Sequence, residues 1–277
     1  MLRMGKDAQM IIADWLIETT KKLGKAEVDA PRTDALVLLE DVLGKDRSWI
    51  LAHDDQKIPT AKLKEVNSLT DRRIRHEPLA YIRGKTEFYG RNFIVSPEVL
   101  IPRPETESIV ELALENIKLK KPKIVDIGCG SGNIGISLKS EKPDWQIDLV
   151  DIDKKALEIA TQNNTQHKLE LNIIESDLFG ELKTSYDVVV ANLPYVPEGL
   201  ITSPEIEKEP SIALFSGVDG MSHYTKFWDQ ISKLSKKPKY IIIESLESQH
   251  MIMAGIAQKS GYTLLKTYTL AQLYSKV

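Results

Sequence analysis

The stretch VDIGCGSGNIG, residues 125–135, decides the fold class. It passes from an apolar, strand-like run into a helix-like run through Gly128, Gly130 and Gly132. Glycine permits a tight turn and a close approach of a ligand to the backbone, and the first turn of the following helix presents unpaired N–H groups. A dinucleotide fingerprint has the spacing G-x-G-x-x-G, whereas Asn133 occupies its sixth position here. The loop therefore predicts a nucleotide-like ligand without choosing between cofactors.

The segments on both sides of this loop alternate between strand and helix patterns. The predicted strands cover residues 123–128, 146–153, 171–176, 186–192, 239–245 and 262–268. The predicted helices cover residues 105–117, 134–140, 154–164, 222–235 and 246–259. Such alternation, with right-handed crossovers, predicts an α/β domain whose mostly parallel sheet is covered by helices on both faces. Ligands of such sheets lie beyond the carboxyl ends of the strands.

The first quarter of the chain has a different pattern. Helical periodicity dominates it, with Pro31 at the start of one helix and Gly44 at its end. Short aromatic and β-branched runs broken by glycine and proline follow from residue 79 and predict extended structure. We therefore expect three parts: a helical N-terminal domain at 1–76, a β-hairpin linker at 77–104 and the α/β domain at 105–277.

Two acidic residues follow the next predicted strands. Asp151 closes one strand about 20 residues after Gly132, where a carboxylate can accept hydrogen bonds from a ribose diol. Asp177 comes directly after the third predicted strand. Each acid alone is equally well explained as a helix cap or a turn residue. In combination with the glycine loop, the two favour a cofactor site, and we interpret Cys129 within the loop as a small filler.

A polar corner, NLPY at residues 192–195, follows a run of valines. Proline after a Val-rich run indicates the end of a buried strand, so Asn192 and Tyr195 are expected at its carboxyl end. The plain alternative is a strand-terminating turn with a buried tyrosine. The corner is interpreted as functional because the same edge of the sheet carries the glycine loop.

Composition limits the classes of function. The net charge is −3, with 37 Lys and Arg against 40 Asp and Glu. This balance argues against a protein that binds nucleic acid mainly through its phosphates. The basic run DRRIRH, residues 71–76, is interpreted as a solvated helix end. The one cysteine, the absence of a long apolar run and the polar start predict a cytoplasmic protein. No metal site is expected, and His223 and His250 are predicted on helix surfaces.

Together these motifs resemble those of S-adenosylmethionine-dependent methyltransferases with a Rossmann-like seven-stranded domain. DIGCGSG (126–132) resembles their first motif, and NLPY resembles the Asn-Pro-Pro-Tyr motif of enzymes that methylate nitrogens on planar groups. The longer segments 77–107 and 209–220 are similar to those of the release factor glutamine methyltransferases (PrmC/HemK family). The resemblance spans about residues 30–265. It implies a small all-α domain and a β-hairpin linker before the methyltransferase domain.

The resemblance also implies an activity and its partners. The expected reaction moves a methyl group from S-adenosylmethionine to the side-chain amide nitrogen of the glutamine in the Gly-Gly-Gln motif of class-I peptide chain release factors, leaving S-adenosylhomocysteine. The helical domain would dock this protein substrate. We expect a monomer that binds no membrane and forms no stable complex with nucleic acid.

Site residues follow from the same resemblance. The side-chain oxygen of Asn192 and the main-chain carbonyl of Leu193 would each accept one N–H of the target amide, and the ring of Tyr195 would pack against it. The implied catalytic and substrate-binding residues are Asn192, Leu193, Pro194 and Tyr195, with Arg103 added for substrate. The implied cofactor-binding residues are Asp126, Gly128, Cys129, Gly130, Ser131, Gly132, Asp151, Asp177, Leu178 and Asn192. An interdomain ion pair is an equally plain role for Arg103.

Three departures from the family pattern keep alternatives open. Leu193 stands in place of the first proline of the motif, Leu246 stands in place of a glycine, and residues 266–277 lack the usual Asp, Gly and Arg. The alternatives are methylation of a ribosomal-protein glutamine, methylation of an amino group of adenine or guanine in nucleic acid, and a binding protein that has lost catalysis. The near-neutral charge balance disfavours the nucleic-acid alternative.

Overall fold

The computed structural model describes residues 10–200 and 203–277. Contacts within the chain divide it into two units. The first runs to Arg83 and includes the short segment Pro204–Lys208, and the second comprises Gly84–Ser203 and Glu209–Val277. Among the described residues, no helix combines the length and apolar character needed to cross a bilayer.

The first unit is helical, as its sequence predicts. Its helices are α1 (Ile12–Lys25), α2 (Pro31–Leu43), α3 (Arg47–Ala52), α4 (Thr60–Ile74) and α5 (Leu79–Arg83), with the 3₁₀ turn η2 (Ile206–Lys208). Pro31 occupies the first turn of α2, and Gly44 ends this helix in the left-handed conformation, which confirms both predicted ends. Apolar side chains of α1 to α4 form its core, among them the fully buried Leu23, Leu38, Leu39, Ile50 and Val66.

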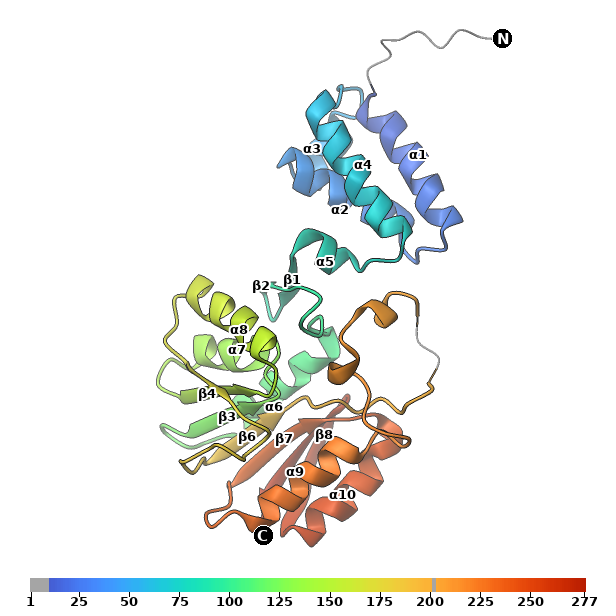
Figure 1. The fold of residues 1–277 in the computed structure, drawn as a ribbon. Helices are drawn as coiled ribbons and strands as arrows, with labels where there is room; N and C mark the ends of the chain where they lie inside the picture. Colours follow the sequence, from blue (N-terminus) through green and yellow to red (C-terminus); the bar gives the residue numbers. More distant parts are fainter. Residues whose placement is uncertain (1–9, 201–202) are drawn as a thin grey trace, which may run out of the picture. The chain divides into compact units, whose positions relative to one another are not determined.

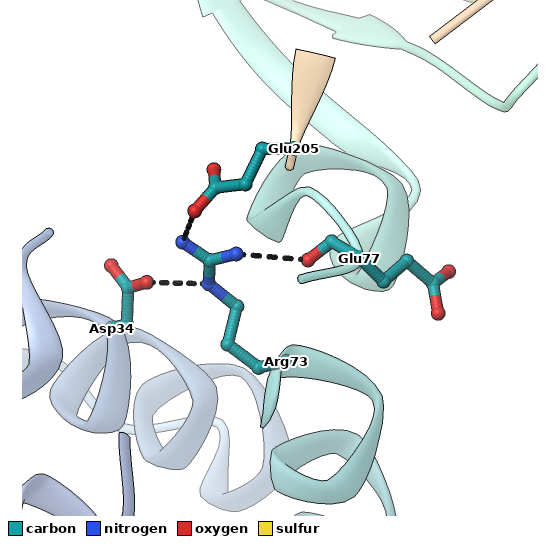
Figure 2. A network of polar contacts seen from close by, with 4 residues as sticks. All are labelled: Asp34, Arg73, Glu77 and Glu205. Carbon is teal, nitrogen blue, oxygen red and sulfur yellow. Dashed lines mark hydrogen bonds and ion pairs between the residues drawn. The ribbon is translucent and has the colours of Figure 1, made fainter. Parts of the chain in front are cut away.

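A buried arginine ties this unit together (Figure 2). Arg73 is 3% exposed and donates from Nε to Asp34 at 2.6 Å, from Nη1 to the Glu77 carbonyl at 3.1 Å, and from Nη2 to Glu205. Burial alone would lower the pKa of Arg73, but hydrogen bonds to the two carboxylates outweigh it and raise the pKa. The interpretation of DRRIRH as a solvated helix end is therefore wrong for Arg73, because the carboxylates that neutralise it come from distant parts of the chain.

The hairpin of the predicted linker is present but starts later than its sequence indicates. Residues Leu79–Arg83 form α5, because Tyr81 and Ile82 are buried on one side of a helical turn that ends at Gly84. Strands β1 (Lys85–Phe88) and β2 (Arg91–Ile94) then pair antiparallel. Tyr89 and Gly90 both have positive φ at the turn, as a tight two-residue hairpin requires. The prediction of extended structure from residue 79 is wrong for the first five residues.

The second unit contains a seven-stranded sheet in the order β5-β4-β3-β6-β7-β9-β8 (Figure 1). Its strands are β3 (Lys123–Ile127), β4 (Gln146–Asp151), β5 (Asn172–Glu175), β6 (Val188–Ala191), β7 (Tyr240–Glu244), β8 (Tyr262–Tyr268) and β9 (Ala271–Lys276). The first five strands are parallel, whereas β9 pairs antiparallel with both β7 and β8. All six predicted strands are confirmed. Only β9 is missed.

Helices cover both faces of this sheet (Figure 1). They are α6 (Glu107–Asn116), α7 (Asn133–Glu141), α8 (Lys154–Gln166), α9 (Ser222–Lys233) and α10 (His250–Lys259), with 3₁₀ turns η1 (Pro104–Thr106), η3 (Ser211–Ala213) and η4 (Glu247–Gln249). Successive side chains of β3 point to opposite faces of the sheet, and each face has its own hydrophobic core. Ile124 packs with α6, α7 and α8, while Val125 and Ile127 pack with α9 and α10.

Because β3 lies between β4 and β6, the chain reverses its winding there, and such a switch point opens a crevice at the carboxyl ends of the strands.

Candidate active site

A cavity of about 340 Å³ lies at this crevice, entirely within the second unit. Its wall contains most of the predicted site residues: Arg103, Gly128, Cys129, Gly130, Ser131, Asp151, Asp177, Leu178, Asn192, Leu193 and Pro194. Three predicted residues do not line it: Asp126, Gly132 and Tyr195. The cavity therefore joins the glycine loop after β3, the acid after β4 and the polar corner after β6.

The glycine loop is held in left-handed conformations that side chains rarely adopt. Gly128 has a φ of 69°, and a Cβ atom there would lie 2.8 Å from Cδ2 of Leu193. Glycine thus lets the loop pack directly against the corner after β6. The Cys129 N–H donates to the Val150 carbonyl at 2.9 Å, which fixes the loop across the end of β4. Cys129 is buried, and burial raises the pKa of its thiol, which agrees with an inert filler.

Asp151 presents a fixed carboxylate to the cavity. Its Oδ2 accepts the Gly130 N–H at 2.9 Å and its Oδ1 accepts the Asp153 N–H at 3.0 Å. Burial raises the pKa of Asp151, and the backbone hydrogen bonds oppose this shift. The same carboxylate therefore supports the glycine loop and forms part of the wall, in a position to meet hydroxyl groups of a ligand.

Asp126 lies behind the loop and not in the cavity wall. Its Oδ2 accepts the Gly135 N–H at 2.9 Å, and its Oδ1 has no partner among the described residues. Burial raises the pKa of Asp126 to about 7. A Cβ atom on Gly135 would come within 2.3 Å of Leu149 Cδ2, so α7 approaches the sheet closely here. In this structure Asp126 anchors the first turn of α7.

The Asn192 side chain is oriented by its neighbours. Its Nδ2 donates to Thr106 Oγ1 at 3.0 Å and to Glu244 Oε1 at 3.1 Å, which uses both N–H groups of the amide. The Leu193 N–H points instead to the Tyr224 hydroxyl at 3.3 Å. Neither Asn192 Oδ1 nor the Leu193 carbonyl accepts a hydrogen bond from another described residue. Two oxygen acceptors of this corner, which lines the cavity, thus have no partner among the described residues.

Tyr195 supports this corner from behind. Its hydroxyl donates to Glu244 Oε1 at 2.9 Å, and its carbonyl accepts from Gln249 Nε2 at 2.9 Å. Burial, followed by the proximity of Glu244, raises the pKa of the Tyr195 phenol, so the phenol is a donor at neutral pH. These contacts place the hydroxyl against Glu244 and away from the cavity wall.

Arg103 forms part of the wall through an internal ion pair. Its Nη2 lies 2.5 Å from Oε1 of the buried Glu209, whose Oε2 accepts the Ile101 N–H at 3.1 Å. Both residues belong to the second unit, so an interdomain ion pair is not the role that the structure gives to Arg103. The pair joins the segment before α6 to the segment after residue 208.

Several cavity residues escape sequence reasoning. Ile152 is 55% exposed in the wall beside Asp151. His223, predicted on a helix surface, lines the cavity and contacts the Ser216 hydroxyl at 2.7 Å, so that prediction is wrong. Burial lowers the pKa of this histidine. Thr106 lines the cavity and Glu244 does not, and neither belongs to a recognised motif; both are identified by their contacts with Asn192.

No cluster of histidine, cysteine and acidic residues suited to a metal ion occurs within residues 10–200 and 203–277. The polar residues of the cavity wall include the carboxylates of Asp151 and Asp177, the side-chain amides of Asn133 and Asn192, and the cations Arg103 and Lys226. Such a set can bind a nucleoside through its sugar hydroxyls and can orient a planar N–H donor with two acceptors.

Both units of the chain match models of known protein families. Residues 14–84 match the family model PrmC N-terminal domain, and residues 106–209 match the model Methyltransferase small domain. A release factor glutamine methyltransferase of Buchnera aphidicola is 37% identical over 94% of this chain and 95% of its own. That of Coxiella burnetii is 34% identical over 84% of this chain and 85% of its own.

A solved structure supports the fold. The methyltransferase from Pyrococcus furiosus superposes with a TM-score of 0.50 at 13% identity, over 74% of this chain and 96% of that one. Because this identity is low, it speaks for the fold alone. The relatives above, similar over most of both chains, show that this chain belongs to the release factor glutamine methyltransferase family.

Proposed function

We propose that the protein transfers a methyl group from S-adenosylmethionine to the side-chain amide nitrogen of the glutamine in the Gly-Gly-Gln motif of class-I release factors. The observation that carries the proposal is the Asn192 corner: Asn192 and Leu193 line the same cavity as the glycine loop and Asp151, and the Asn192 amide nitrogen is held by Thr106 and Glu244. Family membership supports the choice of substrate. In this proposal the protein acts in the cytoplasm as a monomer, with no nucleic-acid partner.

The cavity suits the cofactor. Asp151 would accept hydrogen bonds from the ribose hydroxyls, and the exposed face of Ile152 together with Leu178 would border the adenine. The loop at Gly128–Gly132 would bend around the amino acid portion. Bound S-adenosylmethionine supplies a methyl group on a sulfonium, which is already highly reactive. The remaining task of the protein is therefore to aim the acceptor nitrogen.

The corner after β6 is arranged for that task. An amide nitrogen is a poor nucleophile because its lone pair is delocalised, but it carries two N–H groups. Asn192 Oδ1 and the Leu193 carbonyl would accept one each, which fixes the plane and direction of the nitrogen. Positive charge develops on the nitrogen during transfer and strengthens both hydrogen bonds. The methylated amide is a strong acid in its protonated form, so no histidine or metal is required to remove its proton.

Leucine at position 193 is compatible with this role, because the group used is the main-chain carbonyl. The Leu193 side chain is 4% exposed and packs against the glycine loop. Pro194 restricts the preceding residue to extended conformations, so the carbonyl direction is still constrained.

The direct test is to incubate the protein with methyl-labelled S-adenosylmethionine and, separately, a release factor, a ribosomal-protein mixture and unmodified nucleic acid. Mass spectrometry of the labelled product locates the methyl group. We expect one methyl on the Gly-Gly-Gln glutamine and none elsewhere. Label confined to the ribosomal proteins or to nucleic acid would assign a different substrate, and no label in any sample would contradict enzymatic activity.

Replacing Asp151 by alanine should weaken the binding of S-adenosylmethionine about 10- to 100-fold, because one or two charge-assisted hydrogen bonds to the ribose are lost. Titration calorimetry measures this change. Asp187→Ala is the matched control, since Asp187 also accepts a backbone N–H, from Lys123 at 3.0 Å, but does not line the cavity. Equal affinities of the Asp151 variant and the control would remove Asp151 from the cofactor site.

A further inference from the structure

Glu244 is fully buried and contacts both Asn192 and Tyr195 of the NLPY corner. We propose that Glu244 is a positioning residue whose carboxylate decides which end of the Asn192 amide faces the cavity. This inference rests on the proposed role of Asn192 in methyl transfer.

Strand pairing brings the two residues together. Ala191 is paired with Ile243 in the parallel ladder of β6 and β7, so Asn192 and Glu244 follow side by side at the carboxyl ends of the two strands. Glu244 is fully buried, and its Oε1 accepts from Asn192 Nδ2 at 3.1 Å and from the Tyr195 hydroxyl at 2.9 Å. One carboxylate oxygen thus connects the first and last residues of the NLPY corner.

The chemistry of the partners explains why a carboxylate is used. The oxygen and nitrogen of an asparagine amide have nearly the same shape, so packing alone cannot select one orientation. The hydroxyl of Thr106 can donate or accept, so it selects the NH₂ group of Asn192 only because its own proton is directed to Glu244. The Glu244 oxygen that faces Asn192, Oε1, also accepts the Tyr195 hydroxyl, so it acts as an acceptor and must meet the Asn192 NH₂ group. The amide oxygen is then turned toward the cavity, where the proposed reaction needs an acceptor.

The burial of the Glu244 carboxyl group is unfavourable for folding. Its Oε2 has no hydrogen-bond partner among the described residues. Burial raises the pKa of Glu244, as does nearby Glu105 to a smaller extent, while hydrogen bonds from Tyr195, Thr106 and Asn192 lower it. A buried carboxylate with one unsatisfied oxygen destabilises the folded protein, and such residues concentrate where function requires them.

Two substitutions test the proposal. In Glu244→Gln the shape is kept, but the new amide can turn its own NH₂ toward Asn192 and thereby reverse the Asn192 amide. In Glu244→Met the acceptor is removed. We expect the single-turnover rate constant for methyl transfer, at saturating S-adenosylmethionine, to fall about tenfold in the first and about 100-fold in the second. The dissociation constant of S-adenosylmethionine should stay within about twofold, which also shows that both variants are folded.

The chain offers a closely matched control. Asp148 is 4% exposed and accepts from Asn172 Nδ2 and from the Tyr186 hydroxyl, both at 2.8 Å, but it does not line the cavity. Asp148→Asn therefore removes a buried carboxylate from an Asn–Tyr pair elsewhere in the same sheet, although Asp148 also lies 3.6 Å from Lys123 Nζ. Its transfer rate should equal that of the unmodified protein. A structural role for buried carboxylates in general would lower the rate in this variant too, and would contradict the proposal.

A double variant separates this inference from the proposed function. If Glu244 acts through Asn192, then Glu244→Gln has no further effect on the transfer rate in an Asn192→Ala background. A full tenfold loss in that background would overturn the inference. An unchanged rate in Glu244→Gln and Glu244→Met, with a loss in Asn192→Ala, would also overturn the inference while leaving the proposed function intact. An unchanged rate in Asn192→Ala would instead contradict the proposed function itself.

Discussion

Asn192→Ala is expected to lower the rate constant of methyl transfer by about 100-fold or more, the range found when one preorganised hydrogen-bonding group is removed from an active site. The variant deletes the Oδ1 acceptor at the cavity and leaves the glycine loop and Asp151 in place. S-adenosylmethionine should therefore bind with a dissociation constant within about threefold of the original value. Single-turnover transfer of labelled methyl to a release factor measures the rate, and calorimetry measures the affinity.

Two further variants make this result specific. In Asn192→Asp the oxygen acceptor is kept, but a second carboxylate is placed beside Glu244, at the position where Asn192 Nδ2 now lies 3.1 Å from Oε1. Like charges so close cannot both ionise, so this variant should also lose most of its activity and partly regain it at lower pH. In Asn172→Ala an amide is removed from the buried Asp148 without touching the cavity, and its rate should be unchanged. Weaker cofactor binding with normal transfer at saturation would contradict the assignment of Asn192 to the acceptor.

Local sequence patterns predict the inner strands of the sheet well because β3, β6 and β7 are buried on both faces. The runs YDVVVAN and KYIIIES have uninterrupted apolar centres, VVVA at 188–191 and III at 241–243, and both form inner strands. Strand β9 is different. Its sequence, AQLYSK, has no β-branched residue and places Gln272 at a fully buried position. The Gln272 Oε1 accepts the Ser245 hydroxyl at 3.1 Å, a contact across the sheet that no local pattern contains.

The order of the strands also explains why the sequence predicts that Asp151 and Asn192 share one site. Asp151 ends β4 and Asn192 follows β6, and these two strands lie on either side of β3. The carboxyl ends of parallel strands meet at one edge of the sheet. The prediction that Asp126 lines the cofactor site is not met, because the alternation of side chains along β3 turns Asp126 away from the cavity. Side chains of a strand alternate between faces, so Asp126 points away from the side of Val125 and Ile127, toward α7. The sequence could not identify Glu244 as a site residue, because its role depends on contacts with Asn192 and Tyr195, about 50 residues earlier in the chain.

In the helical unit, Arg73 is buried among carboxylates. Arg73→Met should lower the free energy of unfolding of this unit by about 3–5 kcal/mol, because it leaves a buried charge without its partner. The unpaired group is Asp34, which is 5% exposed and now receives the Arg73 Nε–H at 2.6 Å (Figure 2). Glu205 has a side chain that is 29% exposed, so it can be hydrated when the arginine is removed. Hydrogen exchange of the α2 and α4 amides, followed by mass spectrometry, reports the stability of this unit separately from the sheet domain.

A paired substitution decides whether the loss comes from the uncompensated charge. Arg73→Met combined with Asp34→Leu removes both charges and replaces them with apolar groups, an exchange that is often neutral or stabilising. The double variant should therefore recover most of the stability lost in Arg73→Met. Arg47→Met is the control for an exposed pair, since Arg47 lies 2.8 Å from Glu40 with its side chain 48% exposed, and it should cost at most about 1 kcal/mol. If the double variant is as unstable as Arg73→Met alone, the arginine stabilises the unit through its packing and its bonds to Glu77 and Glu205, and not by neutralising Asp34.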